Sequence, residues 1–120
     1  MRVLIVESDP GLGWLWKRHL ERFSARVTLA GSQDEAVAFL EDEAVEVIVL
    51  DLILGEGSAI AVADYASYRH PRAKVIFVTN TTFFSDGSIF QHIPNACAFL
   101  PSRMPPEDLA AVVEHYGTVD

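Results

Sequence analysis

The sequence has one cysteine, few basic residues and no long apolar run. The single cysteine, Cys97, excludes an intramolecular disulfide, and its apolar neighbours indicate a small buried side chain without chemistry. Runs such as Val47–Leu50 fall far short of the ~18 residues that a membrane-spanning helix needs, so no membrane span is expected. Glu7 and Asp9 follow the first apolar residues directly, which argues against a secretory signal. We therefore expect a cytoplasmic protein.

Basic residues are outnumbered, with 9 Lys and Arg against 17 Asp and Glu and a formal net charge of −8. This balance opposes binding to a phosphate backbone, so no direct nucleic-acid partner is expected. The four histidines, at positions 19, 70, 92 and 115, are too far apart to place two imidazoles on one helix face. A histidine zinc site is therefore excluded as an interpretation.

Short apolar runs alternate with segments of helical spacing along the whole chain. The runs are Val3–Val6, Val27–Ala30, Val45–Leu50, Val75–Thr79 and Ala96–Leu100. Such alternation indicates an α/β fold with a parallel sheet. Over 120 residues it predicts a single domain of five βα units, doubly wound and flavodoxin-like, with strand order 2-1-3-4-5.

The helices have recognisable start and stop signals. After Pro10, one face is predicted to pack on the sheet; it comprises Leu12, Leu15, Trp16, His19 and Phe23. Ser32 with Glu35 forms a capping box for the second helix. The third helix is expected from about Ala59 to Arg69, and the last from about Pro106. A short or irregular helix is expected within residues 85–92.

Polar residues follow the predicted strands at the points where these end. Glu7 comes after the first strand, Asp51 after the third, and Thr79 ends the fourth. In a doubly wound sheet, function gathers at the carboxyl ends of the strands. An Asp at the end of an apolar central strand is costly to bury unless it is solvated, paired or used, so Asp51 is interpreted as a functional carboxylate.

These runs, with Glu7-Ser8-Asp9-Pro10, the Asp51 segment, Val-Ile-Phe-Val-Thr-Asn and Ala-Phe-Leu, resemble the receiver domain of bacterial two-component response regulators. The resemblance spans essentially the whole chain. It implies that Asp51 is the position that accepts a phosphoryl group from a histidine kinase, and that Thr79 contacts this group. Phe99 corresponds to the aromatic switch position. Glu7, Asp51 and a backbone carbonyl near Ile53 correspond to the Mg²⁺ site.

The chain departs from the family pattern at two charged positions. Ser8 stands where the family usually has a second Asp that binds the metal, and Asp9 is expected to point elsewhere. Ser102 stands at the position of the usual Lys, and Arg103 at the following Pro. We therefore expect weak Mg²⁺ binding and a trans Ser102–Arg103 bond, with Arg103 exposed rather than replacing the Lys.

Three functions follow from this resemblance and its departures. The first is a stand-alone, degenerate receiver that acts by protein contact, with phosphorylation at Asp51 weak or lost. The second is a receiver that is still phosphorylated on Asp51. The third is an aspartyl-nucleophile phosphohydrolase, which is disfavoured because Ile53 occupies the place of its acid/base Asp. The protein is thus expected not to be an enzyme, and its candidate partners are a histidine kinase, another signalling protein or a second copy of itself.

Overall fold

The computed structural model describes residues 1–79 and 93–118. Their elements follow one another as β1 (Arg2–Val6), α1 (Pro10–Glu21), β2 (Arg26–Ala30), α2 (Gln33–Asp42), β3 (Val47–Asp51), α3 (Ala59–Arg69), β4 (Lys74–Thr79), β5 (Ala96–Pro101) and α4 (Pro106–Thr118). The strands form one parallel sheet in the order β2-β1-β3-β4-β5, which confirms the predicted fold and strand order. The helix expected within residues 85–92 lies outside the described residues.

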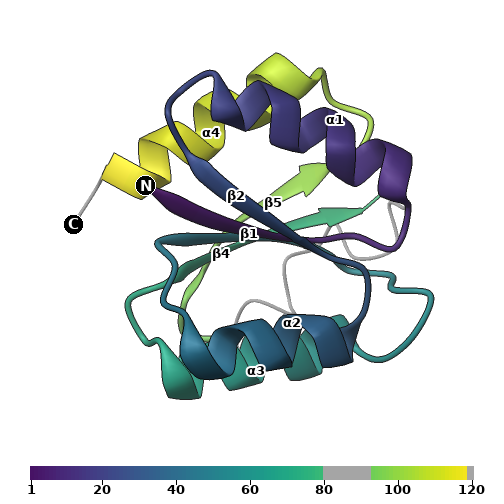
Figure 1. The fold of residues 1–120 in the computed structure, drawn as a ribbon, viewed down its shortest axis with the longest axis vertical. Helices are drawn as coiled ribbons and strands as arrows, with labels where there is room; N and C mark the ends of the chain where they lie inside the picture. The colour runs from purple at the N-terminus through teal and green to yellow at the C-terminus, as the bar shows by residue number, and fades with distance from the viewer. Residues whose placement is uncertain (80–92, 119–120) are drawn as a thin grey trace.

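Two helical layers cover the sheet (Figure 1). Helices α1 and α4 pack on one face and α2 and α3 on the other, and each pair closes its own apolar core. The central strands β1 and β3 are buried on both faces, as their continuous apolar runs predict. None of the helices in the described ranges is long and apolar enough to span a membrane.

Helix α1 differs from the prediction in the face that it buries. Its buried residues are Gly13, Trp16 and Leu20, whereas Leu15 and Phe23 are exposed. The predicted apolar stripe was therefore wrong at these two positions. A Cβ on residue 13 would lie 3.5 Å from Leu29 Cδ2, which is an ordinary van der Waals distance, so this buried position faces β2 although it carries no side chain. Hydrophobic spacing cannot report a contact made by glycine.

The other helix starts match their sequence signals. The Ser32 hydroxyl accepts the Glu35 N–H at 3.2 Å, and the Glu35 carboxylate accepts the Gly31 N–H at 3.1 Å. Ser58 caps α3 in the same way, accepting the Ala61 N–H at 3.2 Å. These caps satisfy donors that the first helical turn leaves without partners, and so fix where each helix begins.

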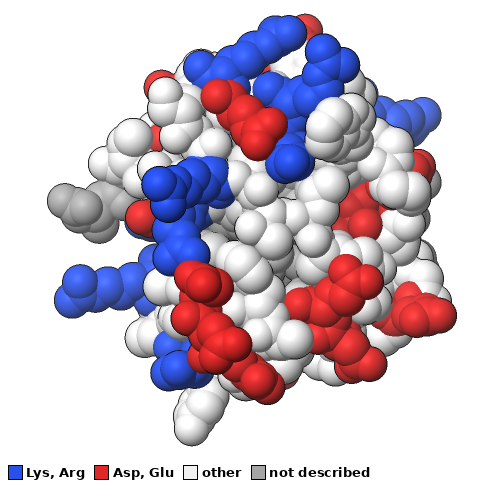
Figure 2. Space-filling model, in the orientation of Figure 1, with Lys and Arg blue, Asp and Glu red and all other residues white. Residues whose placement is uncertain are grey.

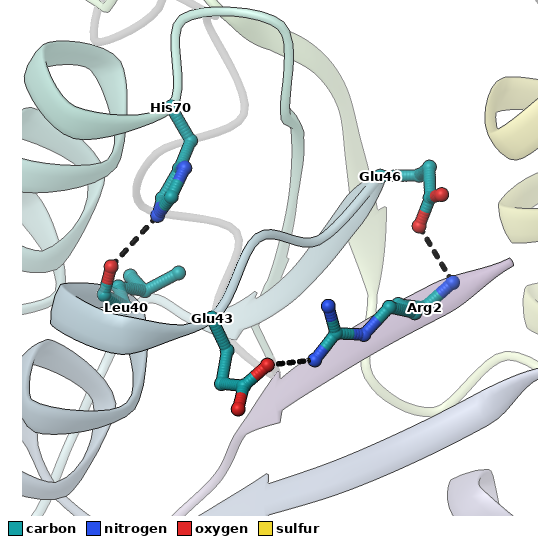
Figure 3. A network of polar contacts seen from close by, with 5 residues as sticks. All are labelled: Arg2, Leu40, Glu43, Glu46 and His70. Carbon is teal, nitrogen blue, oxygen red and sulfur yellow. Dashed lines mark hydrogen bonds and ion pairs between the residues drawn. The ribbon is translucent and has the colours of Figure 1, made fainter.

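Polar contacts tie the elements together at the amino ends of the strands, which we call the amino edge (Figure 3). The Arg2 guanidinium pairs with the Glu43 carboxylate, and the Arg2 backbone N–H donates to Glu46 Oε2 at 2.6 Å. His70 Nε2 donates to the Leu40 carbonyl at 2.7 Å. These contacts link β1 to the segment before β3, and α3 to α2.

Candidate functional site

The strand register brings the predicted site residues to one edge of the sheet, which we call the carboxyl edge. Val6 lies opposite Leu50, Asp51 opposite Val78, and Thr79 opposite Pro101. Glu7, the first residue after β1, is therefore level with Asp51, and Thr79 is one residue beyond it on the neighbouring strand. The predicted convergence of the positions of Glu7, Asp51 and Thr79 is confirmed.

Glu7 is buried although it is an acid, with only 6% of its surface exposed. Its backbone N–H donates to the Ala30 carbonyl at 3.0 Å, which holds the residue at the end of β1. Its Oε2 is buried and accepts no hydrogen bond from any described residue. Burial, together with the hydrogen bond and charge of the neighbouring Asp51, raises the pKa of Glu7 to about 8. Glu7 is therefore mainly protonated near neutral pH.

Asp51 is half-buried at the end of β3, and its Oδ1 accepts the Ile53 N–H at 2.9 Å. This local bond fixes the carboxylate relative to the loop that follows. Ile53 itself is 54% exposed, so its side chain neither covers the carboxylate pair nor supplies a proton-transfer group. The expected role of its carbonyl as a metal ligand stays a prediction.

The two residues after Glu7, Ser8 and Asp9, make different contacts. Asp9 Oδ1 accepts the Gly11 and Leu12 N–H groups at 3.0 and 3.3 Å, so this carboxylate caps α1. Ser8 is exposed and lies beneath the loop after β3, where a Cβ on residue 55 would be 3.6 Å from Ser8 Cβ. The proximity of Gly55 was not predicted, since nothing in the local sequence reports a contact across 47 positions.

The end of β5 carries no inward cation. The Ser102 N–H donates to the Thr79 carbonyl at 2.8 Å, which holds the loop against the end of β4. No cis bond occurs in the described parts of the chain, so Ser102–Arg103 is trans, as expected. Arg103 is exposed and pairs with no carboxylate of residues 1–79 or 93–118. Phe99 is half-buried against the core on the α2 and α3 side.

The donors at the carboxyl edge fit a hydrated magnesium ion only in part. Within the described ranges no group of three His, Cys, Asp or Glu side chains could hold a metal. Glu7 and Asp51 supply carboxyl oxygens as metal ligands, among them the buried Glu7 Oε2, which accepts no hydrogen bond from a described residue. Mg²⁺ keeps several waters and can be held by one or two carboxylates. These residues would hold it mainly through water, and the ion would supply charge neutralisation.

A groove of about 770 Å³ lies at the amino edge, so it is at the opposite end of the strands from Asp51. Arg72, Lys74 and Asn95 are among its lining residues, together with Cys97. Cys97 Sγ donates to the Val75 carbonyl at 3.5 Å, and burial raises the pKa of this thiol to about 11. The thiol is therefore protonated near neutral pH and is a poor nucleophile.

The chain resembles many solved structures, although no protein-family model and no curated protein sequence matches it. A CheY-like response regulator receiver domain protein from Methanospirillum hungatei is 23% identical, with a TM-score of 0.87 over 97% of this chain and 92% of that one. The non-phosphorylated HemR receiver domain from Leptospira biflexa is 26% identical, with a TM-score of 0.84 over 99% and 95%. The chain has the fold of a response regulator receiver domain. A response regulator protein from Burkholderia pseudomallei has the same fold and is 21% identical. The match has a TM-score of 0.81 and covers 98% of this chain and 72% of that one. That structure contains a phosphorylated aspartic acid and a calcium ion.

Proposed function

We propose that the protein is a receiver domain in two-component signalling that acts through protein contact, with phosphorylation at Asp51 weak or lost. The receiver-domain fold supports the signalling role. The arrangement around Asp51 supports the loss of phosphoryl chemistry, because a phosphoryl group on a carboxylate needs cations to neutralise its charge. On this proposal the protein is not an enzyme, and its partner is a histidine kinase or another signalling protein.

The observation that carries the proposal is that the described residues after β5 place no fixed cation beside Asp51. Ser102 occupies the end of β5, where its N–H contacts Thr79, and the adjacent Arg103 is exposed. Residues 80–92 contain no Lys or Arg. Asp51 instead faces a second acid, Glu7. Glu7 is mainly protonated near neutral pH, so it adds no positive charge that would offset the charge of an arriving anion.

A phosphorylation-competent receiver is the second candidate, and one observation favours it. Asp51, Thr79 and the loop that carries Arg103 all lie at the same edge of the sheet. An arginine side chain is long enough to change direction when an anion is present. If Arg103 took the role of the missing Lys, Asp51 could be phosphorylated despite Ser8 and Ser102.

The deciding experiment is phosphoryl transfer from acetyl phosphate with Mg²⁺, followed by intact-protein mass spectrometry. We expect the wild type to be modified at least about tenfold less than a Ser8→Asp/Ser102→Lys variant, which restores the two missing charged groups. Asp51→Asn in both backgrounds is the control. Nearly complete modification of the wild type that is lost in Asp51→Asn and in Arg103→Ala would overturn the proposal in favour of the second candidate.

A further inference from the structure

The sheet edge formed by β2 presents opposite charges above and below the strand. In the shared orientation of Figures 1 and 2, α1 lies above β2 and α2 lies below it. Lys and Arg gather over the upper and left parts of this face, and Asp and Glu gather over its lower part (Figure 2). A protein with a formal net charge of −8 thus has a strongly dipolar face.

The upper charges form a basic strip on α1 and the turn after it, comprising Lys17, Arg18 and Arg22. Arg18 and Arg22 are exposed and pair with no acid in the described parts of the chain, whereas Lys17 lies 3.8 Å from Glu21. Trp14, which is 52% exposed, lies beside the strip with its ring centroid 5.0 Å from the Lys17 ammonium. The strip therefore combines unpaired positive charge with an exposed aromatic ring.

The lower charges form an acidic strip on the outer face of α2, comprising Asp34, Glu35, Glu41 and Asp42. All four residues are exposed, and α2 contains no basic residue. Asp34, Glu41 and Asp42 form no ion pair with any described residue. This strip is the natural counterpart of a basic surface.

Between the strips lies the edge strand β2, which pairs with β1 on one side only. Leu29 of this strand is 37% exposed, although an apolar residue in a strand is usually covered. An unpaired strand edge and an exposed apolar side chain are both typical of surfaces that associate with another chain. Exposed charges placed around such a centre correspond to the rim of an interface.

We propose that this face binds a second copy of the same chain about a two-fold axis that runs parallel to β2 and lies between the two copies. Two-fold contacts require a surface that is complementary to itself. A half-turn about this axis places the basic strip of each copy over the acidic strip of the other, and brings the two copies of Leu29 together. The proposal rests on the fold and the surface charges, so it stands whether or not Asp51 is phosphorylated.

The test is a charge swap followed by sedimentation of the separate and mixed proteins. Variant one carries Arg18→Glu and Arg22→Glu, so both of its strips are acidic. Variant two carries Asp34→Lys, Glu41→Lys and Asp42→Lys, which leave Glu35 as the one acid of the lower strip, so both of its strips are basic. We expect the wild type to dimerise with rising concentration and each variant alone to be monomeric. An equimolar mixture of the two variants is expected to form a heterodimer, since both contacts are then complementary. Both variants keep a net negative charge, so overall attraction cannot explain this result.

A matched control carries the same charge change away from the face, as Arg72→Glu with Arg103→Glu, and should dimerise like the wild type. Circular dichroism verifies that each variant is folded. Dimerisation of either charge variant alone at wild-type affinity would overturn the proposal, as would a wild type that stays monomeric at about 1 mM, a concentration that detects even weak association. Assemblies larger than a dimer would contradict the two-fold contact, because they require a head-to-tail contact that can add further copies. Binding of the monomer to phosphatidylserine vesicles, lost in variant one, would assign the basic strip to a membrane instead.

Discussion

The polar side chains at the amino edge have hydrogen-bond or ion-pair partners, whereas those at the carboxyl edge lack some of theirs among the described residues. At the amino edge, Arg2 contacts both Glu43 and Glu46, and His70 is bonded to the Leu40 carbonyl. At the carboxyl edge, Glu7 is buried beside another acid, with an oxygen that no described residue contacts. The first arrangement links elements that are far apart in sequence and stabilises the fold. The second costs stability, and such costs are typical of functional sites.

The largest effect on this contrast is expected from Glu7→Gln. The folded-state pKa of Glu7 is raised from 4.5 to about 8, so the stability that the protonated group contributes is complete below about pH 4.5 and is lost as the pH rises through about 8. Removing the charge should raise the free energy of unfolding on the order of 2 kcal/mol at about pH 9, with little change at about pH 5. Urea unfolding at both pH values measures this.

The matched control is Glu46→Gln at the amino edge, where the acid is exposed and accepts the Arg2 N–H. It should destabilise slightly at both pH values. If the free energy of unfolding depended on pH in the same way for the wild type and for Glu7→Gln, the buried carboxyl group would not be the cause of the loss of stability at high pH.

An intermediate effect is expected from Ser8→Asp on metal binding. Ser8 is exposed beneath Gly55, which has no side chain in the way, so a direct carboxylate ligand can be added next to Glu7 and Asp51. We expect the affinity for Mg²⁺ to rise about tenfold, or ~1.4 kcal/mol. Titration followed by the fluorescence of Trp14 and Trp16 measures it, with Ser24→Asp as the charge-matched control. Micromolar binding by the wild type would contradict the expected weak site.

The smallest effect is expected from Arg2→Met at the amino edge. The Arg2 and Glu43 side chains are 39% and 46% exposed, so water already screens their ion pair. The backbone bond to Glu46 survives the change. The free energy of unfolding should fall by about 0.5 kcal/mol, measured by urea unfolding, and the loss should shrink further in high salt. A salt-independent loss above ~2 kcal/mol would show that this edge is far more tightly coupled than its exposure indicates.

Local patterns predicted the elements well, because the signals for them are local. The apolar runs identified β1 and β3, and Ser32 identified the start of α2. The face of α1 was wrong at Leu15 because the buried face of the helix includes Gly13, which hydrophobic spacing does not count. At the site, the sequence placed Glu7, Asp51 and Thr79 at one edge. It could not predict the orphaned Glu7 oxygen, which depends on how the neighbouring side chains pack around it.

The contact between the first residue and the last helix has a practical consequence. The Arg26 N–H donates to the Met1 carbonyl at 2.8 Å, and a Cβ on residue 117 would lie 1.9 Å from Met1 Sδ. Met1 therefore touches the final turn of α4, and the amino-terminal end lies beside the end of this helix in Figure 1. A short flexible linker could join the two ends, and a new opening between α3 and β4 would give a circular permutant with the same sheet order. In such a permutant β4 would be the first β-strand of the chain, and β3, which ends at Asp51, would be the last.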